Sequence, residues 1–237
     1  MSEINNDNFK QHINPPLRYR LIKGVIFDLD GTIADTLPLC IEAFRLAIEP
    51  LAQKQLTDKE IIATFGPSEE GTIMALAPHH YEEGLSGYLQ FYEALHIHCP
   101  VPFDGIVALL DYLQHYNVRL AMVTGKGEKS TVISLRQFGI TQHFSIVKTG
   151  SPAGPVKAEC IAEVLQEWND LQKEEVVYIG DAPSDINASR KAGIPVVSAA
   201  WAATADAEKL LSLQPDALFY SVGEFSAWLT EHIHHHS

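Results

Sequence analysis

The stretch Leu21-Ile22-Lys23-Gly24-Val25-Ile26-Phe27-Asp28-Leu29-Asp30-Gly31-Thr32 decides the fold and points to a site. Its apolar run, Val25-Ile26-Phe27, predicts a strand that is buried on both faces, as strands of parallel sheets are. Asp28 and Asp30 follow this strand, and Gly31 permits the sharp turn and close backbone approach that a bound anion needs. Ligands of an open α/β sheet bind outside the carboxyl ends of its strands. We therefore expect a binding site where this strand ends.

Downstream of residue 102, strand patterns alternate with helix patterns. The expected strands cover residues 118–124, 144–148, 176–181, 195–198 and 217–220, the last as a short edge strand. The expected helices cover residues 104–116 (with Asp104 as the cap), a segment that ends at 138 before Gly139, 156–168, 184–192, 204–213 and 222–233. Strands that alternate with helices of this length indicate βαβ units. The sequence therefore predicts an α/β fold with a doubly wound parallel sheet.

Residues 36–102 interrupt this alternation with helical patterns alone. Thr57-Asp58-Lys59-Glu60 is a capping box that begins one helix, and another helix is expected over residues 81–96. This block lies between the first strand and the others. We therefore interpret it as an inserted all-helical domain, with residues 21–35 and 103–233 forming the core.

Both ends of the chain are expected to lie outside the core. Residues 1–20 are polar and contain Pro15-Pro16, which predicts a flexible N-terminal arm, and residues 234–237 predict a tail. Four histidines near the C-terminus resemble a metal-binding cluster: His232, His234, His235 and His236. We interpret them instead as part of a frayed or added tail.

The composition excludes several classes of partner. The chain has 237 residues, with 17 Lys and Arg against 30 Asp and Glu, and a formal net charge of −13. Nucleic acids and anionic membrane surfaces require a basic face, so neither is expected as a partner. No run approaches the ~18 apolar residues that span a membrane, and the N-terminus lacks an apolar signal-peptide segment. Cys40, Cys99 and Cys160 are odd in number and far apart, which favours a reduced, cytoplasmic protein.

Three further segments carry residue types suited to chemistry. Thr124-Gly125-Lys126 ends one expected strand, Lys157 begins a helix, and Gly180-Asp181-Ala182-Pro183-Ser184-Asp185 ends another strand. Each alone has an ordinary explanation: a helix entry, a surface charge, and a turn with a helix N-cap. Together, their positions at strand ends and at a helix start place them at the same carboxyl end of the sheet as Asp28 and Asp30. Carboxylates at such short distances repel one another unless a cation neutralises them. Mg²⁺ suits such a site, because it is a hard cation that prefers oxygen ligands.

These segments resemble the motifs of the haloacid dehalogenase superfamily: Asp-x-Asp-Gly-Thr, a strand-terminal Thr, a Lys, and Gly-Asp-x-x-x-Asp. The resemblance spans about residues 22–230 and implies a Rossmann-like core with the helical insertion as a cap domain. Shorter segments resemble the phosphoglycolate phosphatase and pyrophosphatase branch: Phe65-Gly66-Pro67-Ser68, Thr124-Gly125-Lys126 and Ala200-Trp201-Ala202, the last with Ala where that branch has Gly.

The resemblance also implies a role for each residue. Asp28 would be the nucleophile that forms an aspartyl-phosphate, and Asp30 would protonate the leaving oxygen and later take a proton from water. Mg²⁺ would be held by Asp28, Asp30 (through its backbone carbonyl), Asp181 and Asp185. The substrate phosphate would be bound by Thr124, Lys157, Gly31, Gly125 and Lys126.

Two lysines compete for the main phosphate-binding role. Lys148 ends a strand, whereas Lys157 begins a helix, where the positive end of the helix dipole adds to its charge. The family's lysine lies a helix and a loop before the Gly-Asp motif. From Lys148 to Asp181 the chain would need more loop residues than such connections usually have. We therefore predict Lys157.

The leading functional hypothesis is a Mg²⁺-dependent phosphatase, monomeric or homodimeric, that hydrolyses a small phosphorylated metabolite. A phosphomutase of the β-phosphoglucomutase kind uses the same motifs and is the nearest alternative; a catalytically silent phosphate-binding or interaction module is the alternative from another class. Asp30 argues against a dehalogenase, which needs neither this acid nor a metal, and against a phosphonate hydrolase, which replaces the second aspartate. The cap is expected to select the substrate, yet it contains few lysines and arginines: Arg45, Lys54 and Lys59.

Overall fold

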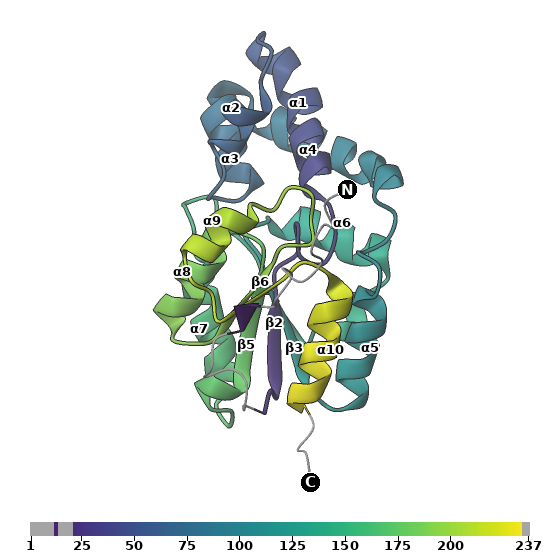
Figure 1. Ribbon diagram of the computed structural model, residues 1–237. Helices are drawn as coiled ribbons and strands as arrows, with labels where there is room; N and C mark the ends of the chain where they lie inside the picture. The colour runs from purple at the N-terminus through teal and green to yellow at the C-terminus, as the bar shows by residue number, and fades with distance from the viewer. Residues whose placement is uncertain (1–11, 14–20, 234–237) are drawn as a thin grey trace, which may run out of the picture.

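The computed structural model describes residues 12–13 and 21–233, and over these residues the chain forms a seven-stranded sheet between two layers of helices (Figure 1). The strands are β1 (His12–Ile13), β2 (Gly24–Phe27), β3 (Arg119–Val123), β4 (Ile146–Lys148), β5 (Val176–Gly180), β6 (Val196–Ala199) and β7 (Ala217–Phe219). Their order in the sheet is β1-β7-β6-β5-β2-β3-β4, with β2 to β7 mutually parallel. The predicted doubly wound α/β fold is confirmed.

β2 lies at the centre of the sheet between β3 and β5. Phe27, its last residue, lies opposite Met122 on β3 and opposite Ile179 on β5. All four residues of β2 are buried, as its apolar run predicts. Since the strands are parallel, the ends of β2, β3 and β5 lie side by side at one edge of the sheet.

The helices of the core cover the two faces of the sheet (Figure 1). One face carries α5 (Ile106–His115), α6 (Glu128–Phe138) and α10 (Val222–Ile233); the other carries α7 (Lys157–Glu167), α8 (Pro183–Ala192) and α9 (Ala207–Ser212). Neighbouring side chains of β2 point to opposite faces, so Phe27 packs against Phe225 of α10 while Ile26 joins Ile161 of α7. Two apolar clusters, one on each face, therefore hold the sheet.

Between β2 and α5 the chain forms four helices beyond the carboxyl ends of the parallel strands (Figure 1). They are α1 (Leu37–Ala52), α2 (Asp58–Ile62), α3 (Glu69–Leu76) and α4 (Tyr81–Leu95). The predicted capping box forms at the start of α2, where the Thr57 side chain accepts a hydrogen bond from Glu60 N. α1 packs on α4 through Phe44 and Tyr88, whose ring centroids lie 4.3 Å apart. No helix within residues 21–233 combines the length and apolar character needed to cross a bilayer.

Two helices, α5 and α9, begin two or three residues after the expected positions. Gly105, with φ 87°, is the N-cap of α5 in place of Asp104. α9 begins at Ala207 rather than at residue 204, because the Asp206 side chain caps it by accepting a hydrogen bond from Lys209 N.

The predictions for the chain ends also need correction. Within the predicted arm, His12–Ile13 pairs antiparallel with β7, so β7 is not an edge strand over the described residues. An uncovered strand edge offers unpaired backbone groups to such a segment. His232 does not belong to a tail: it lies buried in α10, with Nδ1 2.7 Å from the Trp228 carbonyl oxygen. Outside the described residues lie the rest of the predicted arm and the predicted tail, including His234, His235 and His236.

Candidate active site

The central strands bring the predicted chemical residues together at one edge of the sheet. Asp28 follows β2, Thr124 follows β3 and Asp181 follows β5, while Lys157 is the first residue of α7. These four residues line a cavity of about 300 Å³ between the sheet edge and the helical insertion. Asp185, in the first turn of α8, is fully buried beside it.

Asp28, Lys157 and Asp185 form a buried ion-pair cluster. Lys157 Nζ lies 2.7 Å from Asp28 Oδ2 and 2.5 Å from Asp185 Oδ1. Backbone amides orient the two carboxylates: Leu29 N donates to Asp28 Oδ1 at 2.7 Å, and Ala182 N donates to Asp185 Oδ2 at 2.9 Å. The Asp28 carboxylate is thus fixed in orientation and directed at a lysine.

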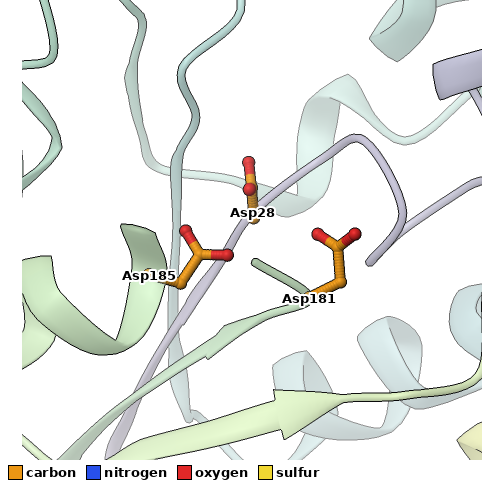
Figure 2. Close-up of side chains that lie close together, drawn as sticks. All are labelled: Asp28, Asp181 and Asp185. Atoms are coloured by element: carbon orange, nitrogen blue, oxygen red, sulfur yellow. The ribbon is translucent and has the colours of Figure 1, made fainter. Parts of the chain in front are cut away.

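Asp181 adds a third carboxylate to this cluster (Figure 2). Asp28, Asp181 and Asp185 each contribute an oxygen, and these oxygens lie within 4.8 Å of one another. Burial, reinforced by the charges of Asp185 and Asp28, raises the pKa of Asp181 well above its usual value. Burial also raises the pKa of Asp28 to about 6; Lys157 opposes this shift and Asp185 adds to it. One lysine does not balance three carboxylates, so the residues present fit a hard divalent cation such as Mg²⁺.

Gly31 makes room for this cluster. Its φ of 74° lies in the left-handed region, which glycine adopts without steric cost. A Cβ at this position would lie 2.1 Å from Asp181 Oδ2. Only a glycine at position 31 lets the turn after Asp30 lie this close to the Asp181 carboxylate.

Thr124 and Gly125 lie at the end of β3, on the wall of the same cavity. Thr124 is buried, and its hydroxyl oxygen accepts a hydrogen bond from Lys126 N at 3.2 Å. Gly125 is in close contact with the loop after β4, where a Cβ on Gly150 would lie 2.0 Å from Gly125 O. The backbone here is closely packed, which fixes the Thr124 hydroxyl relative to the carboxylates.

The two candidate phosphate-binding lysines lie in different surroundings. Lys157 lines the cavity, as described above, and Asp185 and Asp28 raise its pKa although burial opposes them. Lys148 Nζ lies 3.0 Å from Glu163 and 3.2 Å from Glu167, which both belong to α7. Among the described residues that line the cavity, Lys157 is present and Lys148 is not.

A second group of side chains holds the Asp30 carboxylate. Thr36 Oγ1 donates to Asp30 Oδ1 at 2.5 Å, and Lys126 Nζ lies 3.3 Å from the same oxygen. The Lys126 side chain is only 1% exposed, and its Nζ also lies 3.5 Å from Glu69 Oε1 and 4.2 Å from the centre of the Tyr92 ring. Burial opposes the charged form of Lys126, but Asp30 and the neighbouring Cys40, Tyr88 and Tyr92 together more than offset it, and the pKa of Lys126 is raised well above its usual value.

Glu69 is a site residue that the sequence reasoning missed. It lies at the start of α3 in the helical insertion and is buried, yet its carboxylate accepts hydrogen bonds from Gly127 N and Ser130 Oγ at the start of α6 in the core. A carboxylate at a helix N-terminus is stabilised by the unpaired amides and by the helix dipole. Acidic residues are common in the first turn of any helix, so no sequence pattern marks Glu69.

Comparison with known proteins agrees with this arrangement. A family model described as haloacid dehalogenase-like hydrolase matches residues 25–199. The chain belongs to this family. The resemblance expected from the four motifs is therefore confirmed, and the matched residues run from β2 to the end of β6.

Curated relatives of this chain carry different names. The tyrosine-protein kinase PtkA of Mycobacterium tuberculosis is 32% identical over 180 residues, which cover 75% of this chain and 62% of PtkA. The chain thus spans less than two thirds of the length of PtkA. The pyrophosphatase PpaX of Listeria monocytogenes is 27% identical over 209 residues, which cover 87% of this chain and 95% of PpaX.

Solved structures share the fold of this chain. The haloacid dehalogenase-like family protein SP0104 of Streptococcus pneumoniae superposes with a TM-score of 0.70 at 27% identity, covering 87% of this chain and 98% of that one. CbbY of Rhodobacter sphaeroides, solved in complex with phosphate, gives a TM-score of 0.73 at 19% identity, covering 89% and 100%. At that identity the likeness to CbbY shows the fold alone.

Proposed function

We propose that this haloacid dehalogenase-like hydrolase is a Mg²⁺-dependent phosphatase that cleaves a small phosphate monoester through an aspartyl-phosphate on Asp28. One observation carries the proposal. The Asp28 carboxylate lines the cavity with one oxygen 2.7 Å from Lys157 Nζ, beside the carboxylates of Asp181 and Asp185. This arrangement provides a fixed nucleophile next to a cation and a place for a second cation, as attack on a phosphate dianion requires.

Asp28, Asp181 and Asp185 would hold Mg²⁺, with the backbone carbonyl of Asp30 as a further oxygen ligand. When bound, Mg²⁺ supplies positive charge that attracts the substrate phosphate and offsets the repulsion among the carboxylates. Lys157 and the Thr124 hydroxyl bind phosphoryl oxygens, where stabilising charge is most of the catalysis.

In the first half of the reaction, an Asp28 oxygen attacks phosphorus and the ester P–O bond breaks. Asp30 gives its proton to the departing oxygen, so the alcohol leaves uncharged. In the second half, Asp30 takes a proton from water while the water oxygen attacks phosphorus. The bond between phosphorus and the Asp28 oxygen breaks, and inorganic phosphate leaves with the Asp28 carboxylate restored.

Phosphate release from phenyl phosphate tests the proposal. Chelator-treated protein is expected to be inactive and to recover activity with Mg²⁺. Asp28→Asn is expected to abolish turnover, whereas Asp104→Asn, which removes the same charge from an exposed loop, is expected to leave it unchanged. Mass spectrometry of acid-quenched enzyme is expected to find one phosphoryl group, on Asp28.

The alternatives predict other results in the same assays. A phosphomutase would convert a sugar phosphate into its isomer with little phosphate release. A kinase activity like that in the name of PtkA would transfer phosphate from ATP to a tyrosine peptide. A catalytically silent module would give neither turnover nor phosphoenzyme. The complete set of Asp28, Asp30, Thr124, Lys157 and Asp181 supports an enzyme.

A further inference from the structure

The cavity has two chemically different walls. The core side carries the groups assigned above to the phosphoryl chemistry. The side formed by the insertion is mostly apolar, since Glu69 and Thr72 are its polar lining residues, and its apolar members are Leu37, Cys40, Phe44, Phe65, Pro67 and Tyr88. Phe44 is in ring contact with both Phe65 and Tyr88, at centroid distances of 5.9 and 4.3 Å, so the aromatic part of this wall is a continuous packed surface. A phosphate bound at Asp28 would place its ester group against this wall.

The cations on the cavity wall are already neutralised. Among the described residues, Lys126 and Lys157 are the lysines and arginines that line it. Lys157 is paired with Asp28 and Asp185 and serves the phosphoryl group. Lys126 is buried between Asp30 and Glu69, so its charge is balanced before any substrate arrives. Neither lysine is free to pair with a second anionic group.

The lysines and arginines of the insertion lie away from the cavity. Arg45 pairs with Glu42 and Asp58, and Lys54 pairs with Glu60. Lys59 is exposed. Among the described residues none of these three lines the cavity, whereas the carboxylate residue Glu69 does. The wall that would face the leaving group therefore has no unpaired cation among the described residues, and its carboxylate, Glu69, is already paired with Lys126.

Building on the proposed phosphatase activity, we propose that this enzyme is selective for phosphate monoesters whose leaving group is an uncharged, largely apolar alcohol or phenol. An anionic leaving group would enter this wall without a partner, and an unpaired charge in such surroundings is strongly disfavoured. The cavity volume of about 300 Å³ lies at the small end for ligand pockets, which suits one ring or a short aliphatic chain. Pyrophosphate and carboxylated phosphate esters are excluded by the same argument.

Two phenyl esters of equal size and different charge test the selectivity. With wild-type enzyme and saturating Mg²⁺, 4-acetylphenyl phosphate is expected to give a kcat/KM on the order of 10²-fold above that of 4-carboxyphenyl phosphate or of pyrophosphate. Mg²⁺-dependent hydrolysis that favours pyrophosphate or the carboxylated ester would overturn the selectivity and leave the phosphatase proposal intact. No hydrolysis of any ester would overturn both.

A pair of charge insertions locates the selectivity. Phe65→Lys puts a cation on the apolar wall, and Ile62→Lys puts the same charge nearby on an exposed position outside the cavity, since Ile62 is 44% exposed. Phe65→Lys is expected to raise the relative kcat/KM for the carboxylated ester by about tenfold or more, and Ile62→Lys to leave the ratio unchanged. An equal shift in both variants would mean that the overall charge of the insertion, and not the wall, sets the preference.

Inhibition of the wild-type enzyme gives a readout that does not depend on the fold of any variant. Phenylphosphonate and phosphonoacetate both carry a phosphonate that cannot be hydrolysed, and they differ in an apolar ring against a carboxylate. Phenylphosphonate is expected to compete with substrate at a Ki on the order of tenfold or more below that of phosphonoacetate. Stronger inhibition by phosphonoacetate would overturn the proposal.

Discussion

Replacing Lys126 with methionine tests the buried charge network between the core and the insertion. The Lys126 ammonium lies 3.3 Å from Asp30 Oδ1 and 3.5 Å from Glu69 Oε1, with its side chain 1% exposed. Methionine fills similar space without the charge, so the variant leaves the two carboxylates without their shared cation. We expect a large loss in the free energy of unfolding.

The structure sets the size of this loss. Removing one partner of a buried ion pair costs about 3–5 kcal/mol, because the other charge stays buried without compensation. Glu69 is 7% exposed but keeps its hydrogen bonds from Gly127 N and Ser130 Oγ, and the Asp30 side chain is 25% exposed and keeps Thr36. These remaining donors and the solvent around Asp30 reduce the loss to about 3 kcal/mol. That is a large part of the ~5–15 kcal/mol that stabilises a typical protein.

Urea unfolding followed by circular dichroism measures the loss. With a slope of about 3 kcal/mol per molar urea, the midpoint of Lys126→Met is expected about 1 M below that of wild type. Lys59→Met, which removes an exposed lysine charge, serves as the control and is expected to leave the midpoint unchanged. The pKa of Lys126 is raised on folding from its ordinary value of about 10.5, so its contribution is fully present below that pH and is lost only as pH rises further. Measurement at pH 7.5 therefore captures all of it.

A double variant separates the charge network from simple packing. In Lys126→Met/Glu69→Gln the buried carboxylate is replaced by an amide, so about 1–2 kcal/mol of the loss is expected to return relative to the sum of the single variants. A Lys126→Met loss below about 1 kcal/mol, or strictly additive losses in the double variant, would refute the reasoning.

Three further outcomes follow from the site. Lys157→Ala is expected to lower kcat by about 10²–10³-fold, while Lys148→Ala stays close to wild type in the same phosphate-release assay; the reverse order would transfer the phosphate-binding role to Lys148. Asp30→Asn is expected to slow alkyl phosphates far more than aryl phosphates, because a good leaving group needs little protonation, and equal losses would remove Asp30 as the acid. Burial raises the pKa of the Cys40 thiol to about 12, so at pH 8 about one molecule in ten thousand carries the thiolate. Native protein should therefore not be labelled at Cys40 within seconds by a disulfide reagent, and rapid labelling mapped there by mass spectrometry would contradict this.

The parts of the fold that the sequence predicts are those encoded locally. β2 follows from one continuous apolar run, and its burial on both faces follows from its central place in a parallel sheet. The ends of β2, β3 and β5 meet because parallel strands point the same way, so the residues at those ends can be grouped from the order of strands and helices along the chain. The same topology brings the Lys157 ammonium to Asp28 and Asp185.

The parts that the sequence leaves undetermined depend on contacts between distant segments. The pairing of His12–Ile13 with β7 depends on which segment covers the free edge of the sheet. Glu69 belongs to the site because α3 packs against the start of α6, a contact between the insertion and the core. Neither contact has a local signal, since a two-residue strand and an acidic helix start occur in many contexts.

Lys126 shows why the position of a charge in a motif does not fix its role. Its place after Thr124-Gly125 predicts a phosphate ligand, but the structure gives its ammonium two carboxylates, Asp30 from the core and Glu69 from the insertion. We propose that a cation balanced in this way orients Asp30 and joins the insertion to the core, and adds little attraction for a further anion; phosphate binding by Lys126 stays a prediction. The same pairing removes the free positive charge that a second phosphate or a carboxylate would need. On this proposal, Lys126 contributes both to the selection of an uncharged leaving group, together with the apolar wall, and to the stability of the contact between insertion and core.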